Sequence, residues 1–146
     1  MIGAYLDSSV LVKRYVKEPG SREVNRLFSE GSTLLVSSIA WSECLAAFSR
    51  KHHDGSLSAH SYDRATEAFA TEWKSLNEIA LTRETRELIR ELLDRLSLRG
   101  MDAIHLASAL WAERRLGSKL SFYCADRKLA TAARELGLTV VSPGNG

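Results

Sequence analysis

The chain has 146 residues, of which 45% are hydrophobic and 26% are charged, with 9 Gly and only 2 Pro, a composition that is typical of one folded domain and excludes long disordered stretches. Its formal net charge of +2 permits a nucleic-acid partner but does not indicate one. The first residues, MIGAYLD, reach a carboxylate before an apolar segment can form, and nowhere do apolar residues run for the roughly 18 positions of a membrane span, so we expect neither a secretory leader nor a membrane anchor.

Short apolar runs alternate with amphipathic helical patterns along the chain. In the first helical pattern, apolar side chains fall on one face and charged side chains on the other. In chain order, the expected elements are a strand at 4–6, helices at 9–18 and 21–31, a strand at 33–38, helices at 39–53 and 58–76, a strand at 77–82, helices at 83–96 and 101–117, a strand at 119–125, a helix at 126–137 and a strand at 138–142.

Capping residues and glycines mark the ends of these helices. Ser21 and Thr82 precede helical patterns and are expected to be N-caps. Gly100 is expected to end the long charged helix that starts at 83, and Gly117 and Gly137 are expected to end the two helices that follow.

The alternation of strands and helices predicts the fold class. Strands that are separated by helices form βαβ units, and such units build a mostly parallel sheet with helices on both faces. We find no internal repeat, low-complexity segment or linker in the sequence. We therefore predict a single domain over residues 1–146, folded as a three-layer α/β/α sandwich.

Four acidic residues fall near the predicted ends of strands or starts of helices. Asp7 ends the first strand, Asp126 follows the strand at 119–125, Glu43 lies early in the helix after the second strand, and Asp102 lies just after Gly100. The carboxyl ends of parallel strands are where ligands bind in open sheets of this class. Each aspartate also has an ordinary interpretation, because Asp is a common N-cap and complements the helix dipole.

Glu43 does not fit the capping interpretation. The residues one turn away from it on the predicted helix are all apolar: Ile39, Ala40, Ala46 and Ala47. A carboxylate on such a stripe must be paired, coordinated or protonated, because an isolated buried charge is costly. The nearest basic residue further along the helix, Arg50, is seven positions on, so we expect another group to neutralise Glu43.

A cluster of carboxylates at one sheet edge indicates a bound cation. The acids would repel one another without one, and ligand sets made only of oxygens suit Mg²⁺ or Mn²⁺ better than zinc. Such a cation can activate a water and stabilise the charge on a phosphate during phosphodiester hydrolysis. Asp7 is then a metal ligand displayed by a rigid strand, with the hydroxyls of Ser8 and Ser9 beside it.

Four segments together resemble the PIN-domain family, and more narrowly the toxins of VapBC-type toxin–antitoxin modules. They are the Asp after the N-terminal strand, the Glu in SSIAWSECLAA, GMDAIHLASA, and CADRKLATAARELGLTVVSPG. The resemblance extends over essentially the whole chain, including the KEPGS break after the first helix.

The resemblance implies a metal-dependent endoribonuclease. Asp7, Glu43, Asp102 and Asp126 match the family's acidic positions, which bind one or two Mg²⁺ or Mn²⁺ ions, and a metal-activated water then cuts RNA to leave 5′-phosphate and 3′-hydroxyl ends. The resemblance also implies a homodimer, a small antitoxin whose tail enters the acidic groove, and structured RNA substrates such as tRNA.

Two cysteines bear on these expectations. Cys124 occupies a position, two before the last acid, where the family commonly has Thr or Ser, so direct metal binding by Asp126 is the least secure of the four assignments. Neither Cys44 nor Cys124 has a second Cys or a His at ligand spacing, so both are interpreted as reduced, buried thiols of a cytoplasmic protein.

Other polar residues are candidates for contact with the substrate or for support of the metal ligands. His105 shares a helical face with Asp102 and could position substrate, although a packed, hydrogen-bonded histidine is the more ordinary interpretation. Arg14 and Arg127 are placed to hold phosphates, although ordinary surface charge explains each equally well. With Ser8, Ser9 and Cys124 they complete the candidate site.

Other classes of protein fit the sequence less well. A phosphatase of the haloacid-dehalogenase type needs a second Asp at position 9, where this chain has Ser, and a dinucleotide-binding domain needs a glycine-rich turn that LDSSV lacks. A response-regulator receiver needs paired N-terminal acids. The main alternative is a PIN fold that binds RNA or a partner with little or no catalysis.

Overall fold

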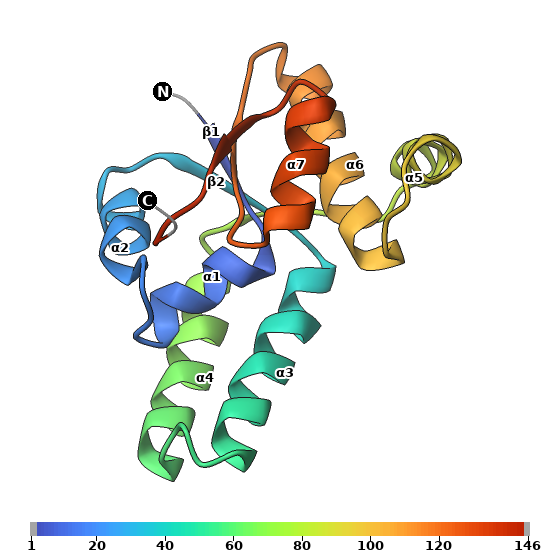
Figure 1. Cartoon of the computed structure of the whole chain (residues 1–146). Coiled ribbons are helices and arrows are strands. Elements are labelled where there is room, and N and C mark those ends of the chain that lie inside the picture. The colour runs from blue at the N-terminus through green and yellow to red at the C-terminus, as the bar shows by residue number, and fades with distance from the viewer. Residues whose placement is uncertain (1–2, 145–146) are drawn as a thin grey trace.

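The computed structural model describes residues 3–144, and five short strands in that stretch form one parallel sheet. The strand order is β3-β2-β1-β4-β5, so the N-terminal strand lies at the centre of the sheet (Figure 1). Every neighbouring pair is parallel, because helices connect successive strands along the chain. The strands are β1 (Gly3–Leu6), β2 (Thr33–Ser37), β3 (Asn77–Ile79), β4 (Ser121–Tyr123) and β5 (Thr139–Val141).

Helices cover both faces of this sheet. One face packs against α1 (Ser8–Tyr15), α2 (Ser21–Ser29), α3 (Ile39–His53) and α4 (Ala59–Trp73). The other face packs against α6 (Gly100–Leu116) and α7 (Arg127–Glu135), and α5 (Arg83–Arg95) lies outside them against α6. The predicted three-layer α/β/α sandwich with a parallel sheet is confirmed.

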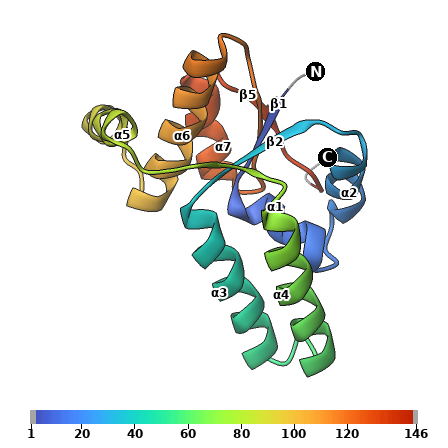
Figure 2. The same cartoon turned by 180° about the vertical axis from the view of Figure 1, so that it is seen from behind.

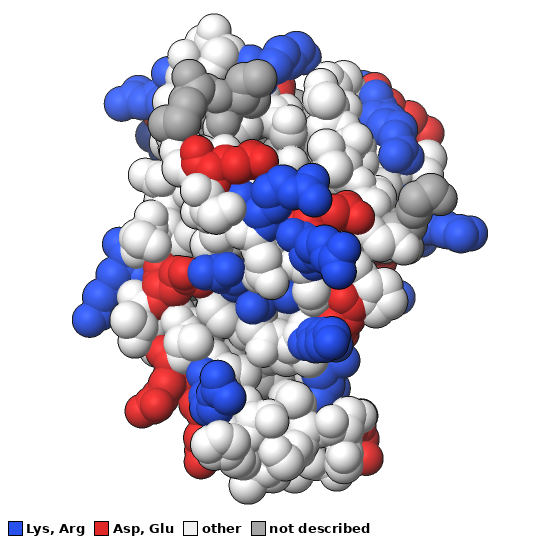
Figure 3. Space-filling view, turned by 90° about the vertical axis from the view of Figure 1, so that its left-hand side faces the viewer, with Lys and Arg blue, Asp and Glu red and all other residues white. Residues whose placement is uncertain are grey.

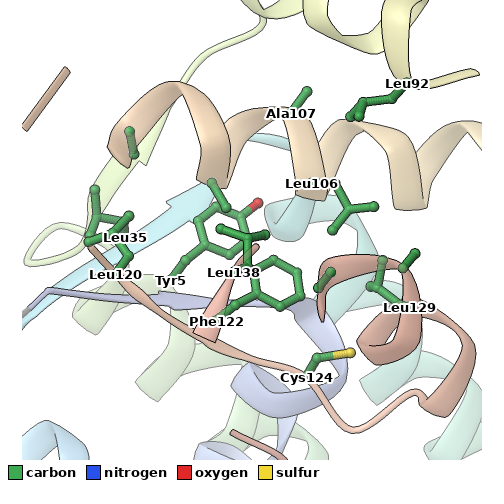
Figure 4. Packing of buried hydrophobic residues seen from close by; sticks show 14 of the residues in the cluster. Tyr5, Leu35, Leu92, Leu106, Ala107, Leu120, Phe122, Cys124, Leu129 and Leu138 are labelled. Carbon is green, nitrogen blue, oxygen red and sulfur yellow. The ribbon is translucent and has the colours of Figure 1, made fainter. Parts of the chain in front are cut away.

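Alternation along β1 and β2 divides the core into two clusters. Ala4 and Leu6 point into the cluster under α1–α4, whereas Tyr5 between them points into the cluster under α6 and α7. Leu35 of β2 and Phe122 of β4 lie opposite Tyr5 in the sheet register and join it on that face (Figure 4). Both faces of the central strand are therefore buried, as its continuous apolar run requires.

The hairpin of α3 and α4 extends away from the sheet (Figures 1 and 2). Aromatic rings hold its two helices together: Phe48 and Trp41 of α3 contact Phe69 of α4 at ring-centroid distances of 5.6 and 5.3 Å. None of the helices among residues 3–144 is long and apolar enough to cross a bilayer.

Two predictions need correction in the turn between α1 and α2, one on the end of α1 and one on the N-cap of α2. The first helix ends at Tyr15 instead of residue 18, because the backbone becomes extended at Val16. Ser21 is the first helical residue and Gly20 is the N-cap. The Ser21 hydroxyl instead bridges the turn, since it donates to Val16 O and accepts from Glu18 N.

The predicted cap and glycine positions around α5 and α6 are only partly right. Thr82 caps α5 as predicted, in a reciprocal capping box with Thr85. Gly117 ends α6 in the left-handed conformation, as expected. Gly100 does not end α5, which stops at Arg95, but is the first residue of α6.

The strands predicted at 77–82 and 119–125 are shorter than expected. They pair with their neighbours only at 77–79 and 121–123, and the chain then leaves the sheet toward the helices that follow.

Candidate functional site

Two of the predicted acidic residues follow neighbouring strands at the same edge of the sheet. Asp7 follows β1 and Asp126 lies just beyond β4, and the Asp7 amide still donates to Tyr123 O at 3.0 Å. The Ser9 hydroxyl links the two strand ends, because it donates to Asp7 Oδ2 and accepts from the Ala125 amide at 3.1 Å. The helices α1, α3, α6 and α7 all begin near this edge (Figure 1).

The capping interpretation is correct for two of the three aspartates. Asp7 caps α1 by accepting from the Ser9 amide through Oδ2, and Asp126 caps α7 by accepting from the Leu129 amide through Oδ1. Each capping bond uses one oxygen, so capping and metal binding by the other oxygen are compatible. Asp102 lies in the first turn of α6, whose N-cap is Arg99, so the capping interpretation is wrong for Asp102.

Glu43 is paired with a histidine from another helix. Oε1 of Glu43 accepts from Ser8 Oγ at 2.5 Å and lies 2.7 Å from Nε2 of His105 on α6. The same nitrogen is 3.3 Å from Asp7 Oδ1. The partner that Glu43 requires is therefore His105, which is 62 residues away in the sequence.

These contacts shift the pKa values of Glu43 and His105 in opposite directions. Burial alone would raise the pKa of Glu43, but the hydrogen bond and charge of His105, together with the Ser8 hydroxyl, hold it below its ordinary value. Burial likewise opposes the charge on His105, yet the hydrogen bond that it donates to Glu43 and the charges of Asp7, Glu43 and Asp102 raise its pKa above the ordinary value. In the metal-free protein, the pair is therefore biased toward a carboxylate and an imidazolium.

His105 is fully packed inside the protein. Its side chain is 1% exposed, and its Nδ1 lies 2.8 Å from the hydroxyl of Tyr5 on β1. This burial favours the interpretation of His105 as a packed, hydrogen-bonded residue over direct contact with a substrate.

Asp102 experiences the negative charge of its neighbours. Its pKa is raised above the ordinary value, first by partial burial and then by the charges of Asp126 and Asp7. Oxygen donors whose charges repel suit a hard divalent cation. Even so, among residues 3–144 no group of three or more His, Cys, Asp or Glu side chains is arranged to hold a metal ion, so the carboxylates would have to reorient to share one.

The thiol of Cys124 contacts the backbone of Asp126. Its side chain is completely buried in the cluster under α6 and α7, where burial raises the pKa of the thiol to about 12. Its Sγ donates to the backbone oxygen of Asp126 at 3.3 Å, and so supports the turn after β4. Cys44 is buried and free as well, as predicted.

The two candidate arginines differ in their surroundings. Arg14 is bound by both oxygens of Glu72 on α4, at 3.0 and 2.9 Å, and lies over the ring of Phe28, so it ties α1 to α4 and α2. Arg127 is exposed at the start of α7, next to Asp126. On the side of the molecule shown in Figure 3, basic side chains are interspersed with acidic ones and form no continuous patch.

An open groove with apolar walls adjoins Glu43 and Asp102 and runs toward the gap between α5 and α6. Two of its apolar residues, Leu81 and Met101, are 43% and 51% exposed. The further lining residues are Arg86, Ile89, Arg99, Gly100 and Ile104. The groove therefore combines apolar walls, two arginines and an acidic end.

The family model described as "PIN domain" matches residues 4–120. The chain belongs to the PIN-domain family. The matched region of this PIN domain contains Asp7, Glu43 and Asp102 and ends before Asp126.

The similarity extends to curated proteins and to solved structures. This PIN domain is 31% identical over 144 residues to Ribonuclease VapC46 of Mycobacterium tuberculosis, a match that covers 98% of this chain and 99% of that protein. FitAcB from Neisseria gonorrhoeae has a TM-score of 0.71 at 16% identity, with 100% of both chains covered. VapBC2 from Rickettsia felis, bound to a DNA fragment from its promoter, has a TM-score of 0.66 at 17% identity, with 98% of this chain and 99% of that chain covered. Identities this low in the two solved structures establish the fold alone.

The sequence analysis of this PIN domain named Ser8, Ser9 and His105 as possible supports of the acids, but it did not predict the contact between His105 and Glu43 or the part of Tyr5. The sequence placed Glu43 on an apolar stripe without a partner, and it placed His105 on the same helical face as Asp102. Those two observations together could have suggested the pair. The role of Tyr5 had no signal in the sequence, because a tyrosine in a central strand is ordinary core.

Proposed function

We propose that this PIN domain is an endoribonuclease that depends on a divalent metal ion and acts as the toxin of a toxin–antitoxin pair. The observation that carries the proposal is the placement of Asp7, Glu43 and Asp102 around the carboxyl end of the central strand. A relative that matches almost the whole chain is called a ribonuclease, which supports RNA as the substrate.

The donor set fits Mg²⁺ or Mn²⁺. Asp7, Glu43 and Asp102 would hold the first ion, and Asp126 would join them or contribute to a second. When bound, the cation supplies charge stabilisation for the scissile phosphate and makes a nearby water easier to deprotonate. Ser9, which accepts from the Ala125 amide, donates to Asp7, and Ser8 and His105 contact Glu43, so these two acids are held by protein hydrogen bonds at the sheet edge. The products would carry 5′-phosphate and 3′-hydroxyl ends.

The proposed partners follow from the family and from the groove. A small antitoxin would place its tail along the apolar walls between α5 and α6 and cover Glu43 and Asp102 at the acidic end. A homodimer is part of the same proposal, and sedimentation of the antitoxin-free protein measures it directly.

One observation favours a second candidate function. Among the described residues, the acids are not arranged to share a metal ion, which is what a PIN fold kept only to bind RNA or a partner would look like. A binding module of this kind would show affinity for RNA without cleavage.

The experiment that decides between the two is incubation of total bacterial RNA with purified, antitoxin-free protein in Mg²⁺, Mn²⁺ or EDTA. We expect discrete fragments from the wild type with either metal and intact RNA with EDTA or with Asp7→Asn. Asn can still cap α1, so the variant should stay folded. Intact RNA in every lane, from protein with a normal melting curve, would support the binding module instead.

A further inference from the structure

A buried chain of hydrogen bonds runs from the core of the protein to the candidate metal site. It begins at the Tyr5 hydroxyl, passes through both ring nitrogens of His105 over distances of 2.8 and 2.7 Å, and ends at Glu43 Oε1. Tyr5 is 0% exposed and His105 1%, whereas the Glu43 side chain is 27% exposed. The chain therefore connects rigid interior groups to a carboxylate that reaches the surface.

The core fixes the first member of this chain. The Tyr5 ring stacks on Phe122 at a centroid distance of 5.4 Å and meets the ring of His105 edge to face at 5.9 Å. Figure 4 shows the Tyr5 hydroxyl pointing from the sheet toward α6. The hydroxyl thus holds the imidazole ring in one orientation on its helix.

The direction of the last hydrogen bond follows from the chemistry of the two groups. A carboxylate oxygen can only accept, so Nε2 of His105 carries the hydrogen that faces Glu43. The Tyr5 hydroxyl can either donate to Nδ1 or accept from it, so it tolerates both the neutral and the charged ring. The hydrogen bond to Glu43 is therefore present in either protonation state, and it is stronger when the ring is charged.

The two oxygens of Glu43 differ in their hydrogen bonds. Oε1 receives the hydrogen bonds of both Ser8 and His105, and these bonds leave Oε2 for another ligand. Asp7 differs, because Ser9 donates its amide and hydroxyl to Oδ2 and Oδ1 lies 3.3 Å from Nε2 of His105, so both oxygens of Asp7 have a protein partner.

We propose that Tyr5 and His105 are positioning residues that hold Glu43 as a metal ligand through a single oxygen. This inference rests on the proposed metal site and goes beyond it, because it assigns a role to two residues that touch neither the metal nor RNA. Partners of this kind, which bind the ligand and not the ion, commonly govern metal affinity about 10- to 100-fold.

The test measures Mn²⁺ affinity by calorimetry on intact protein without RNA. His105→Leu removes the ring hydrogen bonds and should raise the Kd for Mn²⁺ about tenfold or more. His105→Gln supplies an amide N–H toward Glu43 and should recover most of this loss. Tyr5→Phe keeps the stacked ring and should raise the Kd severalfold.

Matched controls come from the hairpin of α3 and α4. His53→Leu and Tyr62→Phe make the same chemical exchanges away from the sheet edge and should leave Mn²⁺ affinity unchanged. A double-mutant cycle identifies the route of the effect: in a Glu43→Gln background, His105→Leu should cause no further loss.

A second readout needs no metal. Long-range ¹H–¹⁵N NMR spectra of the metal-free protein should show His105 Nε2 protonated, and Tyr5→Phe should shift the Nδ1 resonance of the same ring.

The outcomes separate this inference from the proposed function. If the His105 variants melt at lower temperature but bind Mn²⁺ as tightly as wild type, His105 only fills the core and the inference is wrong. Equal losses in His105→Leu and His105→Gln contradict it too, because the N–H would then not be the cause. If His105→Leu does not fold, the Mn²⁺ affinities of Tyr5→Phe and His105→Gln test the inference in its place. A wild type that binds no Mn²⁺ overturns the proposed metal site itself, and this inference with it.

Discussion

Asp7 and Asp126 each cap a helix with one carboxylate oxygen. Asp102 caps no helix, and the negative charges of Asp7 and Asp126 contribute to raising its pKa. Asp7 and Asp126 were predictable from the sequence, because an acid that follows a strand in a parallel sheet lies at its carboxyl edge, whereas Asp102 follows a helix and was singled out only by its place just after Gly100. The pairing of Glu43 with His105 was not predictable, because it joins side chains 62 positions apart whose contact depends on how α3 and α6 pack. Sequence patterns report local periodicity and carry little information on such contacts.

The charge on Asp102 leads to a pH-dependent prediction. Its raised pKa means that the folded protein binds this proton more tightly than the unfolded chain does, so the stability it contributes is present at low pH and is lost as the pH rises through the folded value. In EDTA, Asp102→Asn should therefore melt a few degrees above wild type at neutral pH, and the difference should vanish near pH 3.

Thermal melts across this pH range, with the exposed Asp94→Asn of α5 as the control, test the prediction. A melting temperature for Asp102→Asn that lies below wild type at neutral pH would show that Asp102 stabilises the fold and would contradict its assignment to a repulsive metal site.

At the scale of elements, the sequence predicted where helices lie better than how they begin. Thr82 behaved as predicted because its side chain and that of Thr85 satisfy the first turn of α5 locally. Ser21 and Gly100 did not behave as predicted. The role of Ser21 depends on the turn around Pro19, and that of Gly100 depends on how α6 packs. Gly20 has a left-handed φ of 96°, and its backbone lies against the segment at 143–144.

This close approach predicts a difference between two glycines. A Cβ added at Gly20 would lie 2.8 Å from the backbone of Pro143, whereas one added at Gly55, which has a similar φ of 88°, would meet nothing within 4 Å. Gly55→Ala should cost about 1 kcal/mol from backbone strain alone, and Gly20→Ala about 1–3 kcal/mol more.

Urea denaturation of both variants measures the two costs. Equal losses would mean that the segment at 143–144 does not press on Gly20 in solution.

At the scale of the whole molecule, the two hydrophobic clusters share one sheet. The alternation of Ala4, Tyr5 and Leu6 sends adjacent side chains of β1 into opposite clusters, so neither cluster can lose its packing without disturbing the same strand. The fold class was predictable from the order of strands and helices. The division of the core was not, because it depends on the pairing of β1 with both β2 and β4.

Because both hydrophobic clusters pack on the same strand, we predict that the protein is a single domain and unfolds in one cooperative transition. Phe122→Ala in one cluster and Phe48→Ala in the other should each destabilise the protein by about 3–5 kcal/mol and shift the same transition. Circular dichroism and tryptophan fluorescence should then give coincident curves. Two separate transitions in either variant would contradict a single domain.

The most direct test of the account is a crystal structure of the protein soaked in Mn²⁺, with an anomalous difference map recorded at a wavelength where manganese scatters strongly. We predict a peak at the carboxyl edge of β1, in contact with Asp7, Glu43 and a reoriented Asp102. A map with no peak at this edge, from a protein that retains its four acids and is saturated with Mn²⁺, would contradict the metal site and with it the proposed ribonuclease.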